Sequence, residues 1–190
     1  MLFQMRDLLR NTLPFVLLLA VVVALGLGVE WRRRAGLRRL AAALGGTFEA
    51  GTLVQGVVVP EAAPFDGPPG QREVHYSDVI RLLRPEATFV LARRQEAARG
   101  TSRSMLSSRS VVCLVVLPAG SATPPLDRAR ELPGWIAAVA EVRVQGPVVL
   151  LQGVGGSAGP QHRELYDLAS GWLQAARPRT EVPALQRPGW

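Results

Sequence analysis

The sequence contains one cysteine and two histidines, and this scarcity excludes several kinds of site. A lone Cys113 can form neither an intramolecular disulfide nor a cysteine-based metal cluster. His75 and His162 are far apart in sequence, and neither has the neighbouring cysteine or regularly spaced acids of a metal site. We therefore predict no metal and no cofactor, and we expect Cys113 to pack in the core as a small apolar group.

Lysine is absent, so all 22 basic residues are arginine, and the net charge is +7. The charge is unevenly distributed. Residues 1–39 hold seven arginines and two acids, whereas residues 40–190 hold fifteen arginines and thirteen acids. A nucleic-acid-binding domain concentrates positive charge on its folded part. Here the excess lies near the N-terminus, so we expect no nucleic-acid partner.

The N-terminal part contains a long apolar run without a charged side chain, from Leu13 to Val29. Thr12–Trp31 provides 20 residues, which at about 1.5 Å per residue matches the roughly 30 Å of a bilayer's hydrocarbon. Arg6 and Arg10 precede the run, as in a cleaved signal peptide. The run is longer than a typical signal-peptide core, and three arginines follow it at once. We predict an uncleaved transmembrane anchor within residues 1–31.

Arginines also follow the apolar run, in residues 32–46. Apolar residues in this stretch recur at helical spacing, and Gly45–Gly46 would end the helix. We predict an amphipathic juxtamembrane helix whose arginines contact lipid headgroups. The five arginines expected at the headgroups are Arg32, Arg33, Arg34, Arg38 and Arg39. Their excess over the two arginines before the run predicts a single-pass protein of the inner (cytoplasmic) membrane, with its soluble domain in the cytoplasm.

Within the anchor, small residues recur every four positions, at Ala20, Ala24 and Gly28. Such a stripe lets a second helix approach closely, which drives helix association in lipid. It predicts a membrane protein partner, or a homo-oligomer, packed along this helix. The alternative is that alanine and glycine are simply frequent in this composition, and both interpretations stay open.

After Gly46 the pattern changes to short runs rich in β-branched residues, bounded by glycine or proline. Residues 47–177 are predicted to form one soluble domain, and the Pro-rich residues 178–190 an irregular tail. Predicted strands are Thr47–Glu49, Val54–Val59, Glu73–Leu83, Thr88–Glu96, the central Ser110–Leu117, Val139–Val144 and Val148–Gln152; a loop is expected at Pro60–Gly70, a helical turn at Leu126–Glu131 and a helix at Gln161–Ala176. The fold class is therefore α+β, with one N-terminal transmembrane helix, a mainly antiparallel sheet and a C-terminal helix packed on it.

A glycine-rich stretch between the last predicted strand and the last helix matches two functional motifs. Gly153–Ala158 fits a dinucleotide fingerprint, but the chain after it has no room for the remaining parallel strands. Gly155–Gly159 fits the turn that presents a nucleophilic serine, here Ser157. His162 and Asp167 follow too closely to form a triad with it. We favour a simple connecting loop and assign no catalytic residue.

Arginines also gather within the predicted domain, at Arg93–Arg94, Arg99, Arg103 and Arg109. They are expected either to form a cationic rim that contacts lipid headgroups or an acidic partner, or to be an ordinary solvated face. Asp66 is expected to be a turn residue.

The layout resembles a broad type of uncharacterised bacterial single-pass membrane protein. The residues that carry the resemblance are Trp31–Glu49, Ser110–Pro118 and the C-terminal helix. The resemblance implies an anchor, an Arg-rich juxtamembrane collar and a small β-rich domain, and it implies no activity and no functional residues.

The sequence therefore favours a membrane-anchored, non-catalytic interaction domain that is an accessory subunit of a larger membrane assembly. Two alternatives are a small membrane-tethered serine hydrolase using Ser157 and a peripheral domain that binds anionic lipid.

Overall fold

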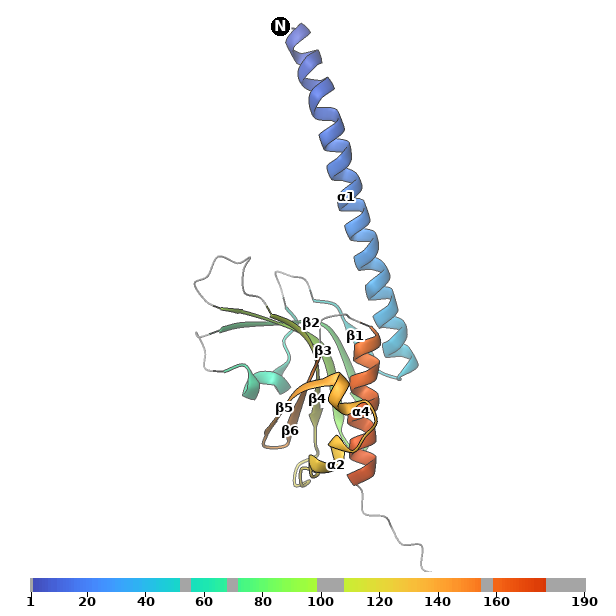
Figure 1. The fold of residues 1–190 in the computed structure, drawn as a ribbon, viewed down its shortest axis with the longest axis vertical. Helices are drawn as coiled ribbons and strands as arrows, with labels where there is room; N and C mark the ends of the chain where they lie inside the picture. Colours follow the sequence, from blue (N-terminus) through green and yellow to red (C-terminus); the bar gives the residue numbers. More distant parts are fainter. Residues whose placement is uncertain (1, 52–55, 68–71, 99–107, 155–158, 177–190) are drawn as a thin grey trace, which may run out of the picture.

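The computed structural model describes residues 2–51, 56–67, 72–98, 108–154 and 159–176. Its most prominent element is helix α1 (Leu2–Ala43), which projects far beyond the rest of the molecule (Figure 1). The predicted anchor and the predicted juxtamembrane segment together form this one unbroken helix. Its part from Leu13 onward is long and apolar enough to cross a membrane, and the most apolar stretch is not buried against the domain.

The folded domain is built on a six-stranded antiparallel sheet in the order β1-β2-β3-β4-β6-β5. The predicted α+β class is confirmed, and the predicted Ser110–Leu117 strand lies in the middle of the sheet. The strands are β1 (Thr47–Glu49), β2 (Arg72–Leu83), β3 (Thr88–Ala98), β4 (Ser108–Val116), β5 (Val139–Gln145) and β6 (Val148–Gly153).

Helix α4 (Pro160–Ala176) covers one face of the sheet, together with the C-terminal end of α1 (Figure 1). Two short helices, α2 (Asp127–Arg130) and α3 (Trp135–Ala138), pack beside α4. Fully buried side chains on this face include Leu37 of α1 and Trp172 of α4. Cys113 is also in this core, as predicted.

The opposite face of the sheet is covered by a short 3-10 helix, η1 (Pro60–Phe65), inside the predicted loop. Val57 and Val59 precede it and are buried against the same face. The described part of the predicted strand Val54–Val59 makes only one β-bridge, between Val57 and Tyr76. Pro60 explains why the chain turns here, since proline cannot donate a ladder hydrogen bond.

A tight turn joins α1 to β1. Gly45 has a positive φ of 63°, and the amide of Gly46 donates a 2.8 Å hydrogen bond to the carbonyl of Ala41. This backbone pattern ends many helices, and glycine adopts the left-handed conformation without a steric penalty. At Gly46 an added Cβ would lie 2.2 Å from Leu82 Cδ2, so the turn packs directly on the sheet.

Candidate functional site

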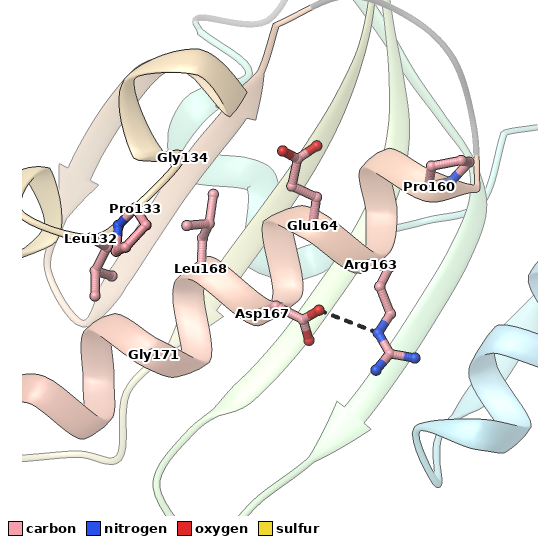
Figure 2. Close-up of a pocket in the computed structure, with 9 residues that line it drawn as sticks. All are labelled: Leu132, Pro133, Gly134, Pro160, Arg163, Glu164, Asp167, Leu168 and Gly171. Carbon is pink, nitrogen blue, oxygen red and sulfur yellow. Dashed lines mark hydrogen bonds and ion pairs between the residues drawn. The ribbon is translucent and has the colours of Figure 1, made fainter.

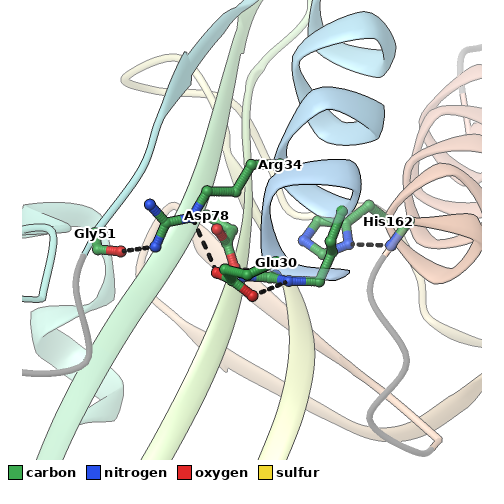
Figure 3. A network of polar contacts seen from close by, with 7 residues as sticks. Glu30, Arg34, Gly51, Asp78 and His162 are labelled. Carbon is green, nitrogen blue, oxygen red and sulfur yellow. Dashed lines mark hydrogen bonds and ion pairs between the residues drawn. The ribbon is translucent and has the colours of Figure 1, made fainter. Parts of the chain in front are cut away.

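Several charged side chains of the described residues lie close together where α1 meets the sheet (Figure 3). Arg33 Nε donates a 2.9 Å hydrogen bond to Glu30 Oε2, one turn earlier on the same helix. Arg34 Nε donates to Glu30 Oε1 at 2.9 Å, and Arg34 Nη2 reaches the carbonyl of Gly51 at 3.3 Å. The other end of the Arg33 guanidinium pairs with Asp78 of strand β2. This junction therefore ties α1 to the sheet by polar contacts as well as by packing.

Asp78 faces Arg33 because strand β2 contains an irregularity there. Ser77 pairs with Arg93 and Ile80 with Leu91, so two residues of β2 oppose one residue of β3. Asp78 has a positive φ of 56°, a conformation that non-glycine residues seldom adopt. Its carboxylate is fully buried, and its Oδ1 makes no hydrogen bond to any described residue. Strained backbone that aims a buried charge at one partner often marks a functional or structural constraint.

His162, in the first turn of α4, is fully buried on the same side of the sheet. Its Nδ1 accepts a 3.3 Å hydrogen bond from the amide of Gly159, which assigns the remaining proton to Nε2. Burial lowers the pKa of His162 to about 4; Asp78 opposes this, whereas Arg33 and Arg93 add to it. His162 is therefore neutral at physiological pH and contributes no charge to the junction.

An open pocket of about 410 Å³ lies between α1 and the sheet, and we call it the junction pocket. Arg33 and Arg34 line it from α1, Arg93 from β3 and Arg109 from β4, and Glu30 is the carboxylate in its lining. Burial lowers the pKa of Arg93, and the nearby charges of Arg33 and Arg109 lower it further. Asp78 and Glu30 oppose this lowering of the Arg93 pKa, so charges of both signs act on Arg93 in the pocket.

On the other face of the sheet, Arg94 is buried in a separate polar cluster. Its Nη1 lies 2.9 Å from Glu96 Oε1, and its Nη2 donates to the carbonyl of Phe65 at 3.0 Å. Tyr76 donates its hydroxyl hydrogen bond to Asp66 Oδ1 at 2.5 Å, and Arg94 lies 3.7 Å from the same oxygen. Arg94 therefore holds η1 on the sheet instead of joining Arg93 in a rim. Adjacent strand residues face opposite sides of a sheet, which separates the pair.

A groove with a volume of about 580 Å³ runs between α4 and the Leu132–Gly134 segment (Figure 2). Leu132 and Leu168 provide its apolar lining. On its rim Arg163 and Asp167 form an exposed ion pair at 3.3 Å. Such a pair on one helix contributes little stability. The lining brings together no nucleophile and base, so we assign it no chemistry.

The residues predicted to act at the membrane lie on α1. Ala20 and Ala24 are exposed, and a Cβ added at Gly28 would meet nothing within 4 Å, so the small-residue stripe is uncovered. Helix packing along this stripe stays a prediction. Of the five predicted headgroup arginines, Arg33 and Arg34 are half-buried against the domain, and the other three are exposed. Headgroup contact by the five also stays a prediction.

The structure describes two of the three residues weighed for catalysis, His162 and Asp167. The third, Ser157, lies outside the described residues, as do Arg99 and Arg103 of the predicted cationic rim. The His162 ring is buried and its Nδ1 is occupied by Gly159, while Asp167 pairs with Arg163 on the exposed side of α4. Among the described residues, no group of three His, Cys, Asp or Glu side chains is placed to hold a metal ion.

Sequence reasoning missed the role of Asp78 and the burial of His162. One signal for the first was present. Val74 and Tyr76 alternate with polar residues, and the adjacent apolar pair Val79–Ile80 then breaks this alternation; both are fully buried, on opposite faces of the sheet. A break in alternation of this kind indicates a β-bulge. His162 gave no such signal, because a polar residue in the first turn of a helix is usually exposed.

Comparison of the chain with protein-family descriptions, with curated proteins and with solved structures gave no significant match.

Proposed function

We propose that this protein is a single-pass membrane protein whose domain is a non-catalytic interaction module, an accessory subunit of a larger membrane assembly. The observation that carries the proposal is the double use of α1. Its Leu13–Val29 part exposes an apolar surface on every side, while Leu37 and Ala41 of the same helix are buried in the core of the domain. An exposed apolar surface of this size in a single chain requires lipid or a partner to cover it.

The junction supports an assembly role because it fixes the domain to the anchor. The continuous helix, the buried Leu37 and the Arg33–Asp78 ion pair leave no flexible linker between them. A partner bound to the anchor would therefore hold the domain in a defined position at the membrane surface. The excess of arginine after the apolar run places the domain in the cytoplasm in this proposal.

The stripe of Ala20, Ala24 and Gly28 is the proposed contact with a second membrane helix. Replacing Ala20 and Gly28 with leucine would fill the groove that a partner helix needs. We expect the A20L/G28L variant to lose its co-purifying membrane protein, or to change from oligomer to monomer, in mild detergent. The measurement is mass spectrometry of the purified sample combined with light scattering.

A matched control is available in the same helix. Gly26 is also open, with nothing within 4 Å of an added Cβ. It lies about 200° around the helix from the middle of the stripe, at roughly 100° per residue. Gly26→Leu adds to the opposite side the same bulk as Gly28→Leu adds to the stripe, and it should leave the assembly intact. If A20L/G28L behaves as the wild type does, the stripe is not an interface.

The proposal competes with a hydrolase that uses Ser157. A fluorophosphonate probe reacts with an activated serine, and the interaction module should not be labelled by it. Labelling of the wild type that Ser157→Ala abolishes would contradict the proposed function.

A further inference from the structure

The junction pocket carries more positive than negative charge. Four arginines line it, whereas the carboxylates at or beside it are Glu30 in the lining and Asp78, which is buried behind Arg33. The net local charge is therefore +2. Arg33 and Arg34 already donate to these two carboxylates and to the backbone. The remaining positive charge belongs to Arg93 and Arg109.

Arg93 and Arg109 are the guanidinium groups available to a ligand. Within the described parts of the chain, neither forms an ion pair with a carboxylate, although both line the pocket. Both lie on the same face of the sheet. Arg93 and Gln95 are two residues apart on β3 and therefore face the same side, and Gln95 is paired with Arg109 of β4. Two guanidinium groups facing one cavity present several N–H donors in fixed planes, which suits the oxygens of a phosphate group.

The depth of the pocket along α1 identifies where such a phosphate would come from. If hydrocarbon ends near Trp31, Arg33 and Arg34 lie about 3–5 Å further along the helix axis, at about 1.5 Å per residue. The headgroup layer extends roughly 5–7 Å beyond the hydrocarbon on each side of a bilayer. Both arginines, and the pocket that they share with Arg93 and Arg109, therefore lie at the level of lipid phosphates.

We propose that the junction pocket binds the phosphate of an anionic phospholipid, with Arg93 and Arg109 donating to the phosphate oxygens and the acyl chains lying along the apolar surface of α1. The pocket volume of about 410 Å³ suits a phosphate and part of a headgroup and excludes a whole lipid. The net charge of the pocket favours an anionic lipid over a zwitterionic one. This inference rests on the membrane span of the proposed function, but not on the interaction stripe.

The test uses the full-length chain in mild detergent, titrated with phosphatidylglycerol or phosphatidylcholine and followed by native mass spectrometry. We expect phosphatidylglycerol to bind at least tenfold more tightly. The double variant R93Q/R109Q should weaken phosphatidylglycerol binding at least tenfold. The control R32Q/R39Q removes the same charge from exposed arginines close to the same surface, and it should weaken binding less than threefold.

Several outcomes would overturn the proposal. Equal weakening by both double variants would mean diffuse attraction to negative charge. Equal affinity of the wild type for the two lipids would remove the anionic preference. If inorganic phosphate raises the melting temperature of the wild type and phosphatidylglycerol does not bind, the ligand is a soluble phosphate and not a lipid. If R93Q/R109Q does not fold, R93K/R109K keeps the charge but loses the planar donor pairs, and unchanged phosphatidylglycerol binding by that variant would contradict the assigned contacts.

The A20L/G28L variant separates this inference from the proposed function. It lies away from the pocket, so it should keep the preference for phosphatidylglycerol even where its assembly is lost. Conversely, R93Q/R109Q should lose the preference for phosphatidylglycerol while its assembly stays intact. That result would assign lipid binding to the junction pocket and assembly to the stripe.

Discussion

The buried ion pair between Arg33 and Asp78 allows a quantitative test of the junction. Asp78 is fully buried, and 20% of the Arg33 side chain is exposed. Arg33→Gln leaves the Asp78 carboxylate buried without a charged partner, which typically costs about 3–5 kcal/mol. Domains are stable by roughly 5–15 kcal/mol in total, so the variant should lose about a third of the free energy of unfolding.

Removing both charges should cost less than removing Arg33 alone. Asp78→Asn keeps the size of the side chain, and asparagine tolerates the positive φ of this position. The double variant R33Q/D78N therefore contains no buried unpaired charge. We expect it to be more stable than R33Q by at least about 1.5 kcal/mol, because replacing Asp78 with asparagine removes the cost of a buried charge without a partner.

The assay is thermal and urea unfolding of the full-length chain in detergent, followed by tryptophan fluorescence. Trp135 and Trp172 are both buried in the domain and report its unfolding. A loss of 3 kcal/mol or more should lower the melting temperature by roughly 10 °C. The exposed control Arg39→Gln should stay within about 0.5 kcal/mol of the wild type. If R33Q loses less than about 1 kcal/mol, or R33Q/D78N is no more stable than R33Q, the pair does not hold the junction.

Three further predictions concern single buried side chains. The pKa of His162 is lowered from 6.5 to about 4 in the folded state, so the unfolded chain binds the proton more tightly. The free energy of unfolding should therefore fall as pH decreases from about 6.5 to 4, by about 3 kcal/mol in all. The same decrease between pH 7 and 4 in a His162→Leu variant would contradict this. Leu37→Ala should destabilise the domain by about 2–5 kcal/mol in urea unfolding, because Leu37 is fully buried between α1 and the sheet; a loss below about 1 kcal/mol would mean that α1 is not part of the core. Burial raises the pKa of Cys113, so a maleimide should label it only after denaturant is added, and rapid labelling of the native chain would show that this strand is open.

Much of the fold follows from local patterns in the sequence. Val148–Gln152 and Ser110–Leu117 are apolar runs between turn residues, and both form strands buried on both faces. The helix predicted at Gln161–Ala176 begins one residue earlier, at Pro160, a residue that suits the first turn. These elements are predictable because their apolar spacing is set by the one or two faces that each of them buries.

The contacts of the junction could not be predicted in the same way. Arg33 and Asp78 are 45 residues apart, and no local pattern links them. The direction of the Asp78 side chain depends on a bulge, whose position is fixed by pairing between β2 and β3. Arg93 and Arg94 look equivalent in sequence, yet strand alternation sends one to the junction pocket and the other beneath η1. Such sites depend on register, which only the assembled sheet defines.

The continuity of α1 also fixes a rotational relationship between the stripe and the sheet. Gly28 and Leu37 are nine residues apart on one unbroken helix, which at about 100° per residue puts them on opposite sides of its axis. Leu37 points into the sheet, so a helix packed against Gly28 would approach from the side away from the domain. One alanine inserted after Trp31 would rotate the stripe by about 100° relative to the sheet. The domain would then face a direction that differs by the same angle relative to a partner helix packed on the stripe.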